Sequence, residues 1–291
     1  MRRSGTGSAA CGGSILALLL LSAAFAPWLA SQPPAAQDLA LRLEGPTASH
    51  PLGRDDLGRD VLSRLIWGAR MSLPLGLVVV AISVLAGTLL GAAAGYAGGR
   101  TDAAISAVAE LLLAFPGILL AISLVAVLGP RMSNLVVALS LIGWVGFALV
   151  SRGETLRLKR QPFLEAARSS GATGSRVVFR HLMPHLVGPV TVQAALGLGG
   201  VVMAEAGLSF LGLGVPPPSA SWGGMLRDGT QNLLDAPRLA VAPGAAIFLT
   251  VLAAQLLGDG MRRRLLSGAE LGAPARRFAP GSGPLRGGGG S

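Results

Sequence analysis

The segment "QPFLEAARSSGATGSRVVFRHLMPHLVGP", Gln161–Pro189, lies between two long apolar runs. It combines arginines, a glutamate and two histidines four residues apart with glycines, which disfavour a helix interior. Only 13% of the 291 residues are charged, against about 25% in soluble globular domains. The apolar surroundings therefore indicate the fold class, and the polar segment needs a separate explanation.

Apolar residues come in long blocks rather than in the periodic patterns of soluble helices or strands. They make up 51% of the chain, and the mean hydropathy is +0.61. A bilayer core requires about 20 apolar residues in a helix, and a backbone in lipid has to satisfy its own hydrogen bonds. We predict an all-α polytopic membrane protein with six transmembrane helices: Ile15–Ala30, Leu73–Gly95, Ile105–Leu128, Leu135–Val150, Leu186–Leu211 and Leu239–Leu257.

These spans divide the chain into five segments. They are a cytoplasmic N-terminus (1–14), an anchor helix (15–31), an external segment with an amphipathic helix (32–72), a transmembrane core (73–260) and a disordered cytoplasmic tail (261–291). The first apolar run also resembles a secretory signal peptide. Because Pro27 directly follows the candidate cleavage site, we expect a retained anchor.

The basic residues predict the orientation. With both termini in the cytoplasm, sixteen of the 24 basic residues lie inside and eight lie outside. The positive-inside rule therefore places the N-terminus, the C-terminus and the loop 152–185 in the cytoplasm. A net charge of +10 does not indicate nucleic-acid binding, because the arginines lie between apolar blocks and aromatic residues are scarce.

The chain has no recognisable energy source of its own. A P-loop requires a glycine-rich loop that leads into a lysine, and Lys159 follows no such loop. Glu110 and Glu205 fall within predicted spans, where ionisable residues can form a proton relay. No basic partner is evident in a neighbouring span, so a structural role is favoured.

Neither an enzyme nor a metal protein is expected. No catalytic triad or pair of carboxylates occurs within one loop. His181 and His185 have the spacing of a metal clamp on a helix, but Pro184 lies between them and no third ligand is near in the sequence. Cys11 is the single cysteine. We therefore expect no catalytic residue, no metal and no cofactor.

The quoted segment contains its own helix signals. Pro162 suits the first turn of a helix, and Gly171 fits the left-handed position at which a helix ends. Thr173 or Ser175 can cap a second helix, and Pro184 marks the entry to the fifth span. An ordered pair of short helices on the cytoplasmic side suits docking to another protein.

Glu165-Ala166-Ala167, then Gly171 and a helix ending at Pro184, resemble the EAA loop of permease subunits of binding-protein-dependent ABC importers. The resemblance extends from about Ser14 to Arg264 and is closest to the C-type permeases of dipeptide and oligopeptide importers. Further matching stretches are "HPLGRDDLGRDVLSRLIWGARMSL" (His50–Leu73), "LLAFPGILLAISLVAVLGP" (Leu112–Pro130), "RHLMP" (Arg180–Pro184) and "AEAGLSFLGLGVPPPSASWGGML" (Ala204–Leu226).

The resemblance implies a type I ABC importer permease fold in the inner membrane of a bacterium. Its partners would be a homologous B-type permease, two cytoplasmic ATPases that bind the ATP, and an external solute-binding protein. A short coupling helix would insert into a groove of an ATPase. The implied coupling residues are Glu165, Ala166, Ala167, Arg168, Gly171, Arg180, His181 and Pro184. Met183 replaces the leucine of the family's "LP", and His181 replaces an aliphatic residue of the broader consensus.

The external side offers candidates for docking a binding protein. Residues 61–66 predict an amphipathic helix lying on the bundle, with Val61 and Leu65 opposite Asp60 and Arg64. Asp56, Arg59, Asp60 and Trp222, the last expected at the surface, are the external docking candidates. Gly87, Gly91 and Gly95 have the spacing of close helix packing, either within the chain or against the partner permease.

The function expected from the resemblance is the import of di- or oligopeptides. The same machinery can carry nickel chelates, glutathione or another small solute, and no feature of the sequence separates these cargoes. A stand-alone proton-coupled carrier would transport without an ATPase and depend on Glu110 or Glu205. A purely structural membrane protein would not associate with an ATPase at all.

Overall fold

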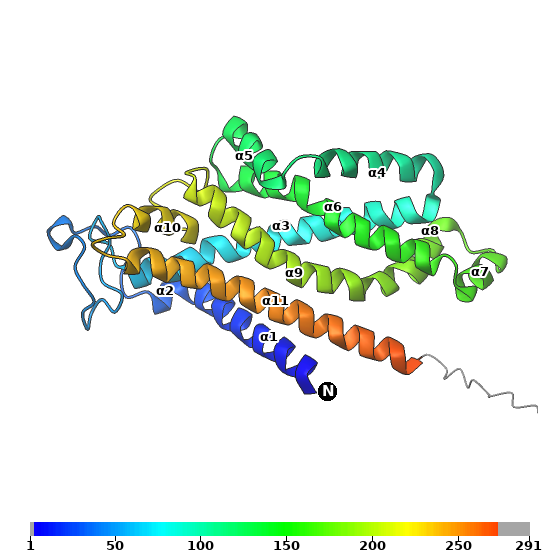
Figure 1. Cartoon of the computed structure of the whole chain (residues 1–291), viewed down its shortest axis with the longest axis horizontal. Helices are drawn as coiled ribbons and strands as arrows, with labels where there is room; N and C mark the ends of the chain where they lie inside the picture. Colours follow the sequence, from blue (N-terminus) through cyan, green and yellow to red (C-terminus); the bar gives the residue numbers. More distant parts are fainter. Residues whose placement is uncertain (1–2, 273–291) are drawn as a thin grey trace, which may run out of the picture.

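The computed structural model describes residues 3–272, in which the regular elements are helices. Within this range, five helices are long and apolar enough to cross a membrane, or six if one bent pair counts as a single span. Figure 1 shows them running along the long axis of an elongated bundle. The predicted all-α, multi-pass architecture is confirmed.

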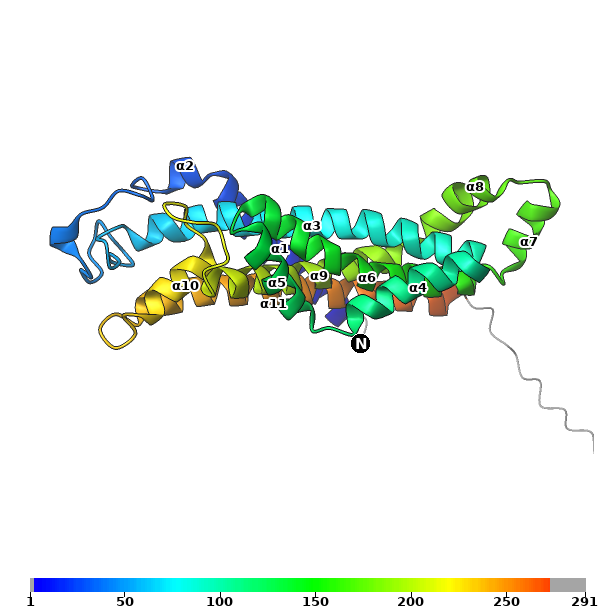
Figure 2. The ribbon, with the colours of Figure 1, turned by 90° about the horizontal axis from the view of Figure 1, so that it is seen from above.

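Four long helices form the bundle, and a fifth helix packs against the outside of the bundle. The four are α3 (Val61–Ala97), α6 (Met132–Leu158), α9 (Met183–Phe210) and α11 (Arg238–Gly272). The N-terminal helix α1 (Arg3–Ala24) packs along α11, as Figures 1 and 2 both show. Glycine makes this close approach possible, because a Cβ on Gly12 would lie 2.5 Å from the Ala253 carbonyl oxygen.

The predicted bounds of the first helix and of the C-terminal tail both need correction. Helix α1 begins at Arg3 rather than at Ile15, and a short helix, α2 (Ala26–Leu29), follows it. Helix α11 continues to Gly272, so residues 261–272 are helical and not part of a disordered tail. The remainder of the predicted tail, 273–291, lies outside the described residues.

Helices α3 and α6 pack through the three glycines of α3. A Cβ at Gly87 or Gly91 would overlap the backbone of α6, and a Cβ at Gly95 would lie 2.8 Å from the Cβ of Thr155. Small residues at this spacing let two helices approach closely in a membrane. Of the two roles considered for these glycines, the structure assigns packing within the chain.

The third predicted span is not one helix. It consists of α4 (Gly99–Leu113) and α5 (Gly117–Leu128), which meet at an angle of 85°. Pro116 explains the break, because it has no N–H to donate and disfavours a helical conformation at Phe115 before it. Helix α5 is about 18 Å long at 1.5 Å per residue, too short to cross a bilayer core of about 30 Å alone.

The predicted external amphipathic helix is instead the first part of α3. Helix α3 runs unbroken through Pro74 for 37 residues, or about 55 Å, and so extends beyond the thickness of a bilayer core. Its polar residues Ser63 and Arg64 are buried, whereas Leu65 and Ile66 are partly exposed. The polar face therefore packs inward, against the loop 31–60 and against α10 (Trp222–Thr230).

Candidate functional site

Helix α7 (Pro162–Ser169) projects at one end of the bundle, opposite α10 and the loop 31–60. Pro162 lies in its first turn, as predicted, and Glu165 is placed where a carboxylate favours the helix dipole. The side chain of Leu164 is fully buried in the main apolar cluster together with Val177 and Leu182, while Glu165 faces solvent. One face thus anchors the helix and the other is free.

Gly171 ends α7 in the left-handed conformation, with φ of +80°. The Ala172 amide donates to the Ala167 carbonyl at 3.1 Å, and the Gly171 amide donates to the Arg168 carbonyl at 2.9 Å. These two hydrogen bonds define a Schellman motif. The predicted role of Gly171 as a helix stop is confirmed.

The second helix of the segment does not stop before the fifth span. Helix α8 (Gly174–Arg176) and a π-helical turn, η2 (Val177–Leu182), continue directly into α9, so the prediction of a helix ending at Pro184 is wrong. The Met183 amide donates to the Val178 carbonyl five residues back. This wider turn fits next to Pro184, which has no amide hydrogen to give. Thr173 occupies the N-cap position, but its hydroxyl makes no capping hydrogen bond.

Tyr96, the only tyrosine of the chain, connects α7 to the end of α3. The Arg168 guanidinium lies 5.4 Å from the Tyr96 ring centroid, and the Lys159 ammonium lies 5.9 Å from it, within cation–π range. Lys159 Nζ also donates to the Tyr96 carbonyl at 2.8 Å. On the other side of α7, the Phe163 and His185 rings are 5.3 Å apart. These contacts hold α7 in place against the ends of α3 and α9.

The residues singled out for coupling share this end of the molecule. Ala167 and His181 are half-buried, and the exposed ones are Glu165, Ala166, Arg168, Gly171, Arg180 and Pro184. Sequence reasoning missed Tyr96, Leu164 and the Phe163–His185 contact as the supports of α7. The one available signal was the single tyrosine at the end of an apolar run.

The exposed arginines of this end differ from their neighbours on α6. Arg152 pairs with Asp102 of α4, with Nε–Oδ1 at 2.5 Å and Nη2–Oδ2 at 2.7 Å, and Arg157 pairs with Glu154. Within residues 7–265, whose side chains are described, Arg168, Arg176 and Arg180 form no ion pair. Their charges therefore remain available to an acidic partner.

The two glutamates within the spans lie in different settings. Glu110 is exposed on α4. Glu205 of α9 is only 1% exposed, and the Ser209 hydroxyl donates to its Oε1 at 2.7 Å. The Glu205 side chain therefore sits in a packed core.

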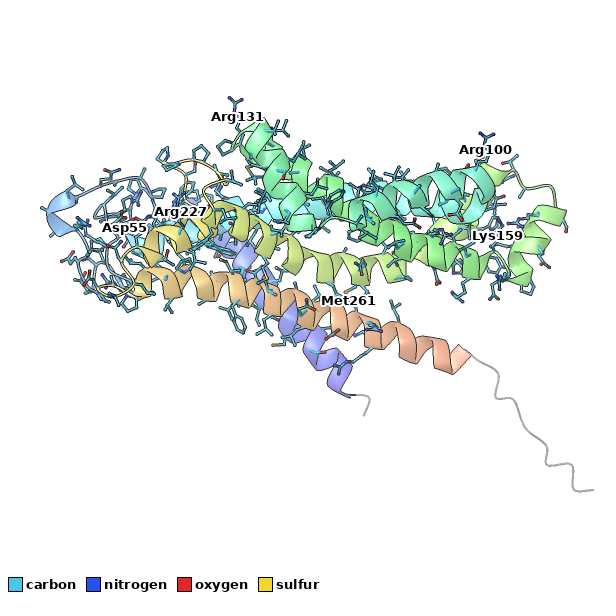
Figure 3. All side chains as sticks on the ribbon, turned by 45° about the horizontal axis from the view of Figure 1, so that its top comes forward. Asp55, Arg100, Arg131, Lys159, Arg227 and Met261 are labelled. Carbon is cyan, nitrogen blue, oxygen red and sulfur yellow. The ribbon has the colours of Figure 1, made fainter. Side chains whose placement is uncertain are left out.

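The external docking candidates are largely buried. Trp222 is not a surface residue: it is 1% exposed, and its indole Nε1 donates to the Leu65 carbonyl at 2.9 Å. Arg59 is also buried, with its Nε 2.6 Å from Oδ2 of Asp55, and Asp56 is partly exposed. Figure 3 places Asp55 and Arg227 at this end and Arg100 and Lys159 at the opposite one.

Asp60 is the N-cap of α3. Its Oδ2 accepts from the Ser63 amide at 2.7 Å, and its Oδ1 lies 2.9 Å from Nδ1 of His50. Burial opposes ionisation of this carboxyl, but the hydrogen bonds from Ser63 and His50 outweigh it and hold the pKa of Asp60 below its usual value. Asp60 therefore stabilises the start of α3 rather than offering a contact surface.

Comparisons with known proteins agree with this architecture. Residues 87–268 match the family described as binding-protein-dependent transport system inner membrane component. Residues 8–46 match the N-terminal TM domain of oligopeptide transport permease C.

Three relatives illustrate the similarity. The dipeptide transport system permease protein DppC of Alkalihalophilus pseudofirmus is 40% identical over 251 residues, 86% of this chain and 83% of the relative. The glutathione transport system permease protein GsiD of Pectobacterium atrosepticum is 46% identical over 222 residues, 76% and 74% of the two chains. The probable D,D-dipeptide transport system permease protein DdpC of Escherichia coli is 39% identical over 248 residues, 85% and 83% of the two chains.

Proposed function

Because the chain belongs to the family of binding-protein-dependent transport system inner membrane components, we propose that it is the C-type permease subunit of an ATP-driven importer of di- or oligopeptides. One observation carries the proposal: α7 is fixed to the spans by buried Leu164 and by Tyr96, and it presents an exposed acidic and basic face beyond the end of the bundle. Such a helix suits insertion into a groove on another protein.

The coupling mechanism follows from the continuity of the helices. Helix α7 joins α6 on one side, and α8, η2 and α9 on the other. When two ATPases close on ATP, a docked α7 moves with them. Because α7 is braced against α3 and α9, its movement tilts the spans and alternates the access of the transport path. Arg168, Arg176 and Arg180 would meet acidic residues of the ATPase groove.

The remaining partners and the orientation belong to the same proposal. A homologous B-type permease completes the path, and an external solute-binding protein delivers cargo to the end that holds α10, where Asp56 is the accessible candidate. Helix α7 and both termini face the cytoplasm of a bacterium, in keeping with the basic residues. ATP binding and hydrolysis belong to the ATPases, so this subunit has no catalytic role and needs no cofactor.

Peptides are the preferred cargo because DppC and DdpC are named as dipeptide permeases and residues 8–46 match a domain of oligopeptide transport permease C. Glutathione is the second candidate, favoured by the 46% identity to a glutathione permease. Nickel chelates and other small solutes stay as alternatives without a specific observation in their favour.

The test is a charge reversal on the free face of α7. Glu165→Lys is expected to reduce co-purification of the ATPases with the permeases about ten-fold, a typical effect of losing one central interface contact. Uptake falls with it, because motion no longer reaches the spans. The matched control for ATPase recruitment is Asp235→Lys, which also reverses the charge of an exposed residue, at the end opposite to α7. Normal ATPase recruitment and uptake by Glu165→Lys would contradict the proposal.

A further inference from the structure

A cavity of about 240 Å³ opens between α3, α5, α6 and α9. Figure 1 shows these four helices meeting in the upper half of the bundle, and their apolar residues share one cluster. The walls include Val80, Ile118, Leu139, Phe147 and Val201. On α6 and α9 the lining residues fall in the middle of each helix, so the cavity lies near the centre of the membrane.

Two polar side chains interrupt these apolar walls. Ser83 is 1% exposed, and its hydroxyl has no hydrogen-bond partner among the described residues. Gln193 of α9 is half-buried and lines the same cavity. A buried polar group without a partner costs about 1–3 kcal/mol, and a serine in a helix usually bonds its own backbone instead. Ser83 is also one of the residues that line the cavity, so this unused hydrogen-bonding capacity lies beside it.

Glycines on α6 provide the space for both side chains. A Cβ at Gly143 would overlap the Ser83 hydroxyl, and a Cβ at Gly146 would lie 3.4 Å from Nε2 of Gln193. These glycines are three residues apart and hence on one face of α6. The packing of α3, α6 and α9 therefore leaves space for the two polar side chains.

The broken span gives a second, independent argument. Helix α5 forms one wall of the cavity through Gly117, Ile118 and Ala121, directly after the 85° break. Within a membrane, backbone that is not helical is tolerated only where it is buried in protein or lines a water-filled space. The face that carries this break is therefore not a lipid-facing surface, and transporters commonly form their cargo sites at broken helices.

We propose that this cavity is part of the cargo path and that Ser83 and Gln193 hydrogen-bond the peptide group of the passing cargo. The proposal rests on the proposed function and assigns it a site. A glutamine amide can donate to a carbonyl and accept from an N–H, and a hydroxyl can do either, so the pair matches both halves of a peptide group. The walls carry no charged residue, so varied cargo side chains can pass.

The first test asks whether water reaches the cavity in the assembled importer. With Cys11→Ser as background, the single thiol of Gly200→Cys or Gly197→Cys probes the wall, since a Cβ meets nothing within 4 Å at Gly200 and makes only an ordinary contact at Gly197. Open membrane sheets containing the full importer are treated with a charged methanethiosulfonate. Phe248→Cys, at a 62% exposed position of α11 outside the cavity, is the control.

We expect at least one of the two cavity thiols to react about ten-fold faster than the control, because thiols ionise in water and not in lipid. Rates equal to the control at both positions would overturn the inference and leave the proposed function intact. Failure of the wild-type importer to take up dialanine or glutathione would instead count against the proposed function.

The second test separates recognition from assembly. Ser83→Ala and Gln193→Leu are expected to raise the KM for uptake of dialanine or glutathione about five-fold each, the effect of losing one neutral hydrogen bond. ATPase co-purification stays at the wild-type level. Gly200→Leu, which fills the cavity, reduces uptake more strongly than Gly207→Leu, an open position on the same helix that does not line it. Unchanged uptake in Ser83→Ala, Gln193→Leu and Gly200→Leu would overturn the inference.

Discussion

Gly171 stops α7 in a conformation that residues with a Cβ avoid, at a cost of about 1–2 kcal/mol. This cost would act on the orientation of α7 rather than on the packing of the spans, because a Cβ at Gly171 meets nothing within 4 Å. The position is thus a sensitive test of whether the angle of α7 matters.

We predict that Gly171→Val lowers uptake and ATPase recruitment, whereas Gly171→Asn retains most of both, because asparagine tolerates the left-handed region. Uptake in vesicles and co-purification of the ATPases measure the effect. Gly153→Val, an exposed helical position of α6 with open space around it, is the control. Equal uptake by the Val and Asn variants would show that the stop is unimportant.

Asp60 acts at the other end of the bundle, as the buried cap of α3. Removing a capping side chain typically costs about 1 kcal/mol, so Asp60→Ala is expected to lower the thermal midpoint of the purified complex. A carboxyl with a lowered pKa stabilises the fold above its unfolded-state pKa, and this contribution is lost as the pH falls through the folded-state pKa.

The stability difference between wild type and Asp60→Ala is therefore expected to shrink below about pH 4. Thermal unfolding of the two proteins across pH 3 to 7 measures it. A difference that grows on acidification would contradict the role assigned to this carboxylate.

Among the elements, α3 and α6 approach each other closely at Gly87, Gly91 and Gly95. We predict that Gly91→Leu destabilises the fold by more than about 2 kcal/mol, because the new side chain meets backbone that cannot move aside. Thermal stability of the purified complex measures this effect. Gly153→Leu, which points into open space on α6, is expected to have a small effect.

The elements also show what local sequence signals can and cannot predict. Pro162 and Gly171 fixed the bounds of α7 because a proline and a left-handed glycine act through their own backbone angles. Pro116 and Pro184 carry the same type of signal with opposite results: one breaks a span, and the other lies inside a continuous helix next to a π turn. The neighbouring packing decides which occurs, and it was not available from either proline alone.

For the molecule as a whole, the proposed function implies that ATP supplies the energy for transport. We predict that reconstituted uptake requires ATP, is blocked by vanadate and is insensitive to a protonophore, because the driving motion enters through α7. Glu110→Gln and Glu205→Gln are expected to retain ATP-dependent uptake. A proton-coupled carrier would be favoured instead if transport took place without the ATPases and if either glutamine variant abolished that transport.

We could predict from the sequence alone the all-helical, membrane-spanning class, most of the spans and the start and stop of α7. These properties depend on the composition of one segment or on the backbone preferences of one residue. The tertiary structure decided that Trp222, Arg59 and Asp60 are buried, that Tyr96 braces α7 and that the glycines of α3 face α6. It also showed that the broken span forms one wall of a cavity lined by Ser83 and Gln193. Each of these depends on contacts between segments far apart in the chain, as between Leu65 and Trp222, and no local pattern records which distant residue will be the neighbour.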